Sequence, residues 1–200
     1  MTSVAPLVER LQRIPKVMLF GAAVIVQVAL LALMVLDRVR ILREGTEVTL
    51  QTRPVDPRDF LRGDYVVLDY DISQLPAGPL ANQPAQSPIV FVKLAPDGNG
   101  VYQAISVHAD AVAVKSPEVL IRGRVVSGAT CGPDNRAFCD RLRIRYNLES
   151  YFVPEGEGRK LEDLRNQRKL MVVAAVTPSG RAAIKRLLVD GEKVYDEPWF

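Results

Sequence analysis

The stretch YVVLDYDI, residues 65–72, is the clearest strand in this sequence. One face would carry Val66, Leu68, Tyr70 and Ile72, and the other would carry Tyr65, Val67, Asp69 and Asp71. Because successive side chains of a strand point to opposite faces, we expect the first set in a core and the second on a mixed outer face. The preceding Gly63-Asp64 pair is typical of a turn that leads into a strand.

Several other segments show the same two-residue period or a short apolar run. They predict further strands at residues 47–53, 89–94, 101–108, 119–126, 141–146, 170–176 and 194–195. Residues 97–100, DGNG, predict a hairpin turn. Residues 181–189 fit a strand or a helix, and the short turns on either side favour a strand. Residues 73–88 contain four prolines and no charge, so we expect a long loop there.

One helix is predicted after the strands at 141–146 and before the one at 170–176. It covers residues 158–167, where Leu161 and Leu164 make a single apolar stripe. Many short strands with one short helix predict a mostly β domain, with a barrel-like or sandwich fold.

The N-terminal part of the chain holds a long apolar run. Residues 17–36 carry no charge, and a helix of 20 residues is about 30 Å long, which matches the hydrocarbon thickness of a bilayer. A cleaved signal peptide is the alternative, but its apolar region is shorter and ends at small residues, whereas Asp37 and Arg38 follow this run. The sequence therefore favours an uncleaved transmembrane anchor.

This anchor divides the chain. We expect a cytoplasmic tail at 1–16, a transmembrane anchor at 17–36, a juxtamembrane linker at 37–45 and an exported β domain at 46–200. Three basic residues lie on each side of the span, so the charge rule for orientation gives a tie. The short tail and the two cysteines, Cys131 and Cys139, favour an exported domain.

The only two cysteines lie close together. Cys131 and Cys139 are the ends of the nine-residue segment CGPDNRAFC, which can close a small disulfide loop. Disulfides persist outside the cytoplasm, and two free, buried thiols are the alternative. With one histidine in the chain, these cysteines do not predict a zinc site. A net charge of +3 without a basic run does not predict nucleic-acid binding.

The sequence resembles a known family. GDYVVLDY, residues 63–70, fits at every defined position the motif that names the GDYXXLXY family, a group of bacterial membrane-anchored proteins. Residues 151–156 and 180–183 resemble later blocks of that family. The resemblance covers residues 40–198. It implies an N-terminal anchor, a domain outside the cytoplasmic membrane and, by analogy, a multi-span membrane protein as partner, but no established activity.

The motif and the later block at 151–156 supply the candidate site residues. They are Gly63, Asp64, Tyr65, Leu68, Tyr70, Tyr151 and Glu155. Leu68 and Tyr70 would be core positions, while Tyr65 faces outward. Tyr65 is either covered by residues 73–88 or forms a contact surface with Asp64. No catalytic residue, cofactor or metal is predicted, and the sequence does not indicate a small-molecule ligand.

Two classes of function remain in view. The first is a non-enzymatic interaction or accessory module for membrane proteins. The alternative is a membrane-bound hydrolase that resembles the serine-lysine signal peptidases, which also carry a Gly-Asp-x-Val strand entry. Residues 37–62 contain no serine, so Thr52 would be its nucleophile, with Lys93 or Lys115 as the base.

Other polar patterns have ordinary explanations. Glu149, Glu155 and Glu157 could belong to a carboxylate-based hydrolase, but acidic residues are common before a helix. The tripeptide at 62–64 matches an adhesion sequence that is frequent by chance.

Alternation within residues 141–146 produces a row of arginines. Arg141, Arg143 and Arg145 would point outward, on a solvated face or as guards of a sheet edge. Near a membrane, such a row could instead meet anionic lipid.

Overall fold

The computed structural model describes residues 15–55, 65–76, 88–127 and 141–197 of the 200-residue chain. The chain divides into two compact units, one that ends at Val39 and one that begins at Arg40. The Cys131–Cys139 disulfide predicted from the sequence lies outside the described residues.

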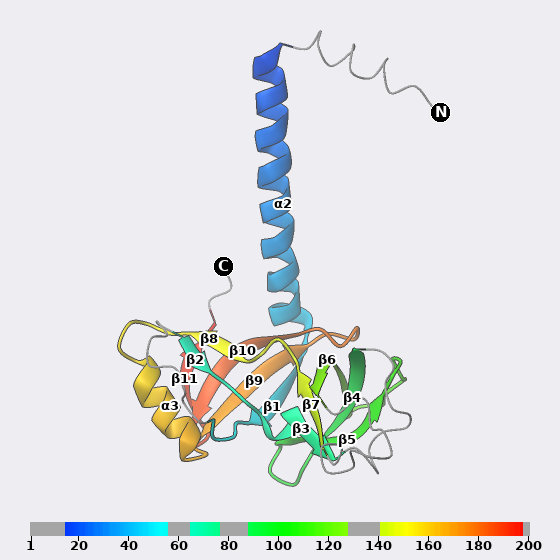
Figure 1. Cartoon of the computed structure of the whole chain (residues 1–200), viewed down its shortest axis with the longest axis vertical. Coiled ribbons are helices and arrows are strands. Elements are labelled where there is room, and N and C mark those ends of the chain that lie inside the picture. The colour runs from blue at the N-terminus through cyan, green and yellow to red at the C-terminus, as the bar shows by residue number, and fades with distance from the viewer. Residues whose placement is uncertain (1–14, 56–64, 77–87, 128–140, 198–200) are drawn as a thin grey trace. The chain divides into compact units, whose positions relative to one another are not determined.

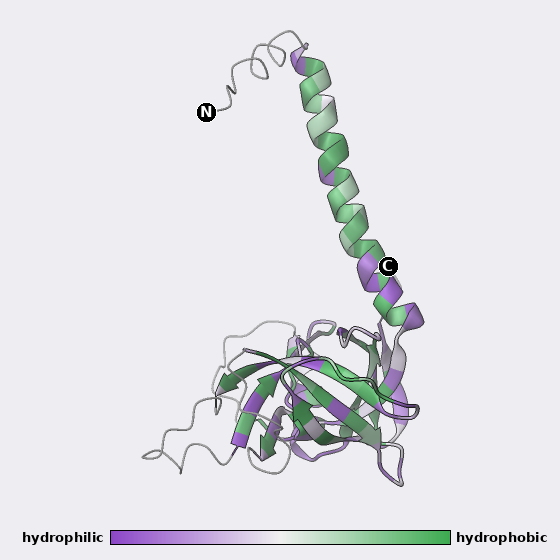
Figure 2. Cartoon of the chain, turned by 90° about the vertical axis from the view of Figure 1, so that its right-hand side faces the viewer, coloured by the Kyte–Doolittle hydropathy of each residue, from purple (hydrophilic) through white to green (hydrophobic). Residues whose placement is uncertain are grey.

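The first unit contains most of helix α2, Lys16–Glu44. It is 29 residues long and includes the whole apolar run at 17–36. Figure 2 shows it as hydrophobic over most of its length, and its large apolar side chains are exposed. In length and composition it is suited to cross a membrane.

The second unit is mostly β and contains a nearly closed, barrel-like sheet (Figure 1). A four-stranded sheet has the order β1 (Thr46–Gln51), β9 (Leu170–Val176), β10 (Ala182–Val189), β11 (Glu192–Asp196). A five-stranded sheet has the order β3 (Gln74–Pro76), β7 (Arg141–Arg145), β6 (Val119–Ser127), β4 (Ile89–Pro96), β5 (Tyr102–His108). A two-stranded ribbon joins β2 (Tyr65–Val67) and β8 (Ser150–Phe152). Every pair of neighbouring strands within these sheets is antiparallel.

The fold class predicted from the sequence is confirmed. Residues 182–189, which fit either a strand or a helix, form strand β10. The predicted helix is α3, Gly158–Asn166. The remaining strand predictions correspond to β1, β4, β5, β6, β7, β9 and β11.

The prediction of one strand over 65–72 is wrong in length. Strand β2 stops at Val67, because its partner β8 is only three residues long. The chain then forms a 3-10 turn, η1, at Asp71–Ser73. Strand β3 follows at once and pairs with β7, in the first part of the segment predicted as a loop. Sequence periodicity did not predict β3 or β8.

The predicted alternation of faces is confirmed even though the strand is short. Val66, Leu68, Tyr70 and Ile72 have 3% or less of their surface exposed. The intervening residues from Tyr65 to Asp71 are half-buried. The inward set joins one core with side chains from all three sheets, so the motif stretch lies at the centre of the packing.

An arginine is buried beneath this stretch. The Arg165 side chain, on α3, is 1% exposed and donates hydrogen bonds to the backbone carbonyls of Val67 and Val55, the latter at 3.3 Å. It also donates to Asn166 Oδ1 at 3.0 and 3.1 Å. Burial lowers the pKa of its guanidinium, but an arginine begins so far above neutral pH that it stays charged. Arg165 therefore ties α3 to the end of β2.

We predict that Arg165→Ala destabilises the protein by about 3 kcal/mol, because two backbone carbonyls lose their charged donor. Urea unfolding of the full-length chain in mild detergent measures this cost. Arg159→Ala, an exposed arginine on the same helix, is the control and is expected to change stability by less than about 0.5 kcal/mol. Equal effects of the two substitutions would contradict the role given to Arg165.

Candidate functional site

The motif stretch is held by the ribbon and by the chain that precedes it. Tyr65, Val66 and Val67 pair with Phe152, Tyr151 and Ser150, in that order. Past the end of β2, Leu68 N donates to Glu149 O at 2.9 Å, and Arg53 N donates to Asp69 O at 2.9 Å. Gly63 and Asp64 lie outside the described residues.

Tyr70 contributes a buried hydrogen bond. Its hydroxyl donates to Leu148 O at 2.5 Å, and its side chain is fully buried. Burial raises the pKa of Tyr70 well above its ordinary value, with a smaller contribution from the charge of Glu149. Tyr70 therefore stays a neutral donor, and together with Leu68 it serves the core rather than the surface.

Tyr65 lies on the outer side of the ribbon. Its ring is 5.9 Å from the ring of Phe152, measured between centroids, at an interplanar angle of 52°. Phe152 is 79% exposed, although it is a large apolar side chain. The cross-strand neighbours are thus a half-buried Tyr65 and an exposed Phe152, which we call the aromatic pair below.

The two candidate residues from the later block, Tyr151 and Glu155, differ in environment. Tyr151 is 6% exposed and packs in the core. Burial and the nearby Glu197 carboxylate raise the pKa of Tyr151 to about 12. Glu155 is exposed on the connection between β8 and α3. Of the motif residues that the structure describes, Tyr65 and Glu155 are thus the ones with side chains available to a partner.

Two of the three residues proposed for a hydrolase, Thr52 and Lys93, have side chains engaged elsewhere. The Thr52 hydroxyl is fully buried and donates to Leu170 O at 2.5 Å. Lys93 Nζ lies 2.7 Å from a Glu118 carboxylate oxygen, and this contact lowers the pKa of Glu118. Lys115 uses its backbone N–H on Glu118. No contact that the structure describes joins Thr52 to either lysine, so the geometry does not favour a threonine-lysine pair.

Two of the three candidate glutamates accept hydrogen bonds within the domain. Glu149 accepts a hydrogen bond from Tyr146 N at 2.6 Å, and Glu157 accepts one from the Tyr195 hydroxyl at 3.1 Å. Glu155 is exposed. Within the described ranges, no group of three or more histidine, cysteine, aspartate or glutamate side chains is placed to hold a metal ion.

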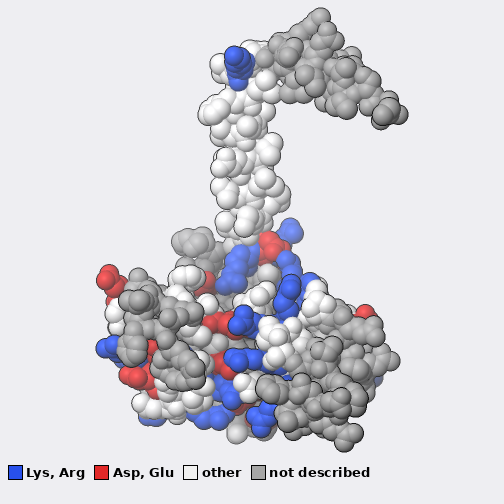
Figure 3. Space-filling model, viewed as in Figure 1, with Lys and Arg blue, Asp and Glu red and all other residues white. Residues whose placement is uncertain are grey.

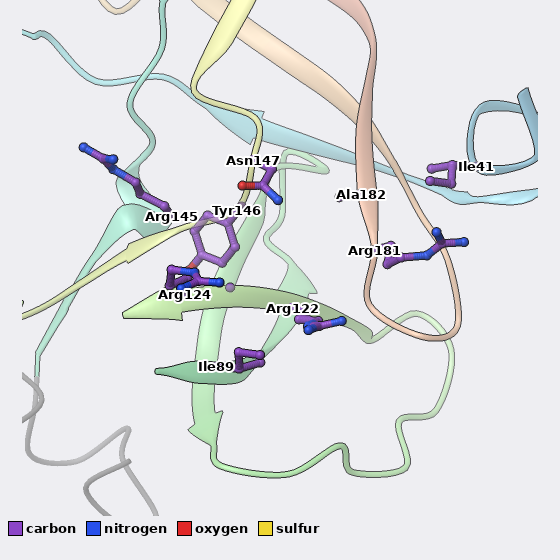
Figure 4. Close-up of a pocket in the computed structure, with 10 residues that line it drawn as sticks. Ile41, Ile89, Arg122, Arg124, Arg145, Tyr146, Asn147, Arg181 and Ala182 are labelled. Atoms are coloured by element: carbon purple, nitrogen blue, oxygen red, sulfur yellow. The ribbon is translucent and has the colours of Figure 1, made fainter. Parts of the chain in front are cut away.

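A hollow of about 380 Å³ lies beside the five-stranded sheet, and sequence reasoning missed it. We call it the arginine pocket. It is lined by Ile41, Ile89, Arg122, Gly123, Arg124, Arg145, Tyr146, Asn147, Arg181 and Ala182. Figure 4 shows these side chains coming from the end of α2, from β4, from β6, from β7 and the residues that follow it, and from the start of β10.

A close contact between the turn before β10 and strand β6 positions two of the arginines. Gly180 has φ +81°, and its carbonyl accepts a hydrogen bond from Arg122 N at 2.8 Å. A Cβ at Gly180 would lie 2.9 Å from that nitrogen. Both the positive φ and this close approach therefore favour glycine at position 180. The turn before β10 therefore packs against β6 and brings Arg181 close to Arg122.

A second glycine shapes the wall of the pocket. A Cβ at Gly123 would lie 2.3 Å from Ile144 Cγ2 and 3.0 Å from the ring of Tyr146. Gly123 thus leaves room for Tyr146 to cross over β6, where its hydroxyl donates to Ile72 O at 2.7 Å. Burial raises the pKa of Tyr146 well above its ordinary value, so it remains a neutral donor.

Positive charge is concentrated on this side of the sheet. Arg124 on β6 lies directly opposite Arg145 on β7 in the strand register, an arrangement of like charges that destabilises a sheet. Among the residues that the structure describes, no carboxylate lies within ion-pair distance of Arg122, Arg124 or Arg145. Figure 3 shows Lys and Arg side chains together with carboxylates on the face of the β domain turned to the viewer.

These features define a class of protein: a mostly β domain that follows one long apolar helix, with a tyrosine-rich motif strand at its core. The family model described as GDYXXLXY protein matches residues 27–187. The chain therefore belongs to the GDYXXLXY family, as its motif indicated. Comparisons with curated proteins and with solved structures gave no match.

The two faces of the motif strand lead to a prediction about stability. Leu68→Ala should cost roughly 2–5 kcal/mol, because it opens a cavity in the core. Tyr65→Ala should cost less, about 1 kcal/mol, because Tyr65 is half-buried and its described ring contact is with an exposed side chain. Thermal and urea unfolding of the full-length chain in mild detergent measures both. A Tyr65 variant as unstable as the Leu68 variant would make the motif purely structural.

Proposed function

We propose that this protein is a single-pass protein of the bacterial cytoplasmic membrane. In this proposal its β domain lies on the periplasmic side and acts as a non-enzymatic interaction or accessory module. Its partner is a multi-span protein of the same membrane. Residues 1–16 are then the cytoplasmic tail, 17–36 the transmembrane anchor, 37–45 the juxtamembrane linker and 46–200 the exported domain.

The aromatic pair is the observation that carries this proposal. Phe152 exposes most of its ring on a short ribbon, directly beside Tyr65 of the family motif. Aromatic side chains are enriched in protein interfaces, because they bury a large area and lose few rotamers. Leu68 and Tyr70 fix the chain just behind the ribbon, so the pair is presented on a firmly packed support.

Helix α2 supports the membrane part of the proposal. A helix that is apolar on all sides belongs either in the core of a large protein or in a membrane. The large apolar residues of α2 between Val17 and Leu36 are exposed in this chain. A bilayer would remove this surface from water, and the length of the helix is sufficient to span it.

The hydrolase alternative has weaker support. A threonine nucleophile needs an exposed hydroxyl within reach of a neutral base. The Thr52 hydroxyl is buried and already donates to a backbone carbonyl, and Lys93 is held beside a carboxylate. An interaction module requires neither group, so it agrees better with this geometry.

The proposed orientation predicts the behaviour of two reporters. Alkaline phosphatase fused after Phe200 should be active, and green fluorescent protein exported there as an unfolded chain should stay dark. In the same compartment Cys131 and Cys139 should form a disulfide, worth about 2.5 kcal/mol in the chain-entropy model. Thiol labelling of the unfolded, unreduced protein should then find no free thiol. An inactive phosphatase fusion together with a bright fluorescent-protein fusion would show the opposite orientation.

A pull-down from membranes tests the interaction itself. Full-length protein is extracted in mild detergent, and co-purifying membrane proteins are identified by mass spectrometry. Phe152→Ala and Tyr65→Ala should each lower recovery of the partner at least about tenfold, the size of a strong interface residue. Ile105→Ala, an exposed apolar residue on β5, is the matched control and should leave recovery unchanged. Equal recovery with all three variants would exclude the aromatic pair as the contact.

A further inference from the structure

We propose that the arginine pocket binds the phosphate group of an anionic phospholipid. The inference rests on the proposed membrane attachment, but it concerns a different surface from the aromatic pair. Its basis is the group of Arg122, Arg124, Arg145 and Arg181 around one hollow (Figure 4).

The chemistry of the lining fits a phosphate. A guanidinium group presents a planar fork of donors that matches two phosphate oxygens, which makes arginine a common residue in phosphate sites. Four such groups come from three parts of the chain: β6, β7 and the start of β10. The Asn147 side chain adds an amide from the same wall. The volume of about 380 Å³ is within the range of small-ligand pockets.

Three of the pocket arginines, Arg122, Arg124 and Arg145, differ in their carboxylate contacts from the basic residues of the other sheet. On the four-stranded sheet, Lys185 and Arg186 both contact the Glu47 carboxylate, at 2.8 and 3.1 Å. Arg186 also lies 3.7 Å from the Asp196 carboxylate. Within the described part of the chain, Arg122, Arg124 and Arg145 contact no carboxylate. An anion between Arg124 and Arg145 would relieve the repulsion that their register creates.

The position of Ile41 favours a lipid over a dissolved phosphate. Ile41 lines the pocket and lies in α2, five residues after Leu36. Five helical residues correspond to about 8 Å along the helix axis. The polar layer of a bilayer begins where the hydrocarbon ends and is about 5–8 Å thick on each side. If residues 17–36 span the hydrocarbon, Ile41 lies near the outer edge of the polar layer that contains the lipid headgroups.

The apolar part of the lining points to the same ligand. Ile41 and Ile89 line the pocket together with the arginines. An inorganic phosphate has no apolar part to place against them, whereas the acyl chains of a phospholipid begin close to its phosphate. Of the three outward arginines predicted at 141–145, Arg145 lines the pocket, while Arg141 and Arg143 do not.

The experiment uses the full-length chain in nanodiscs made of equal parts phosphatidylcholine and phosphatidylglycerol. After extraction in mild detergent, mass spectrometry measures the phosphatidylglycerol that stays bound, relative to phosphatidylcholine. Wild-type protein should enrich phosphatidylglycerol about tenfold, and the double variant Arg122→Gln/Arg124→Gln should return to the bulk ratio. Arg141→Gln/Arg143→Gln removes the same charge from the same sheet and should keep the enrichment.

Two readings would overturn the inference. Equal loss in both double variants would mean that general charge, not the pocket, attracts the lipid. Absence of enrichment in the wild type would exclude a lipid ligand. Arg124→Lys, which keeps the charge and loses the fork, should give an intermediate enrichment and guards against a folding defect, because the substituted side chain is exposed.

A soluble probe separates the two sources of phosphate. Glycerol 1-phosphate is titrated by calorimetry into the full-length chain in nanodiscs of phosphatidylcholine alone. Weak binding that depends on Arg122 and Arg124, together with lipid enrichment, supports the proposal. Saturable binding of glycerol 1-phosphate without lipid enrichment would overturn it in favour of a soluble ligand.

The proposed membrane attachment can fail independently of the pocket. Carbonate extraction of membranes shows whether the chain and each variant remain in the bilayer. If the chain is washed off, the anchor is wrong and the lipid source is excluded with it. If the chain stays and phosphatidylglycerol is not enriched, the anchor stands and the pocket inference fails.

Discussion

The hydrogen bonds around the end of strand β2 are the constraint on which the rest of the domain depends. A ribbon of three residue pairs is not stable on its own, so other groups must hold it. Arg165 binds its last carbonyl from below, Glu149 accepts from the next N–H, and the Tyr70 hydroxyl reaches Leu148. These contacts come from α3 and from the β7–β8 connection. The family motif thus marks the place where three parts of the chain meet.

Much of this arrangement follows from side-chain patterns in the sequence. Alternation correctly placed Leu68 and Tyr70 in the core and Tyr65 outside, because the period of a strand depends on local geometry alone. The helix at 158–166 was also visible, since Leu161 and Leu164 repeat at a helical spacing. The long apolar run was evident from composition, and the family from the motif itself.

The remaining features depend on contacts between distant residues, and local patterns do not report them. Sequence patterns did not single out Arg165, although it lies four positions after Leu161 on the same helix face. Its partners are backbone carbonyls, which leave no mark in the sequence. The arginine pocket joins Arg122 to Arg181 through a turn that only the folded chain brings onto β6. Strand β2 is shorter than predicted because it pairs with only the three residues of β8. The length of a partner strand cannot be predicted from the sequence of one strand alone.

The four residues between β7 and β8 connect the two surfaces discussed above. Tyr146 and Asn147 line the arginine pocket, while the carbonyls of Leu148 and Glu149 accept the bonds from Tyr70 and Leu68. Asn147 has φ +61°, a left-handed conformation that asparagine tolerates better than most residues, and the chain bends there between its two roles. A core substitution that loosens Leu68 or Tyr70 therefore removes support from the pocket wall as well. Exposed substitutions such as those at Phe152 or Arg124 leave this connection intact, and for that reason they can separate a contact made by the ribbon from a contact made by the pocket.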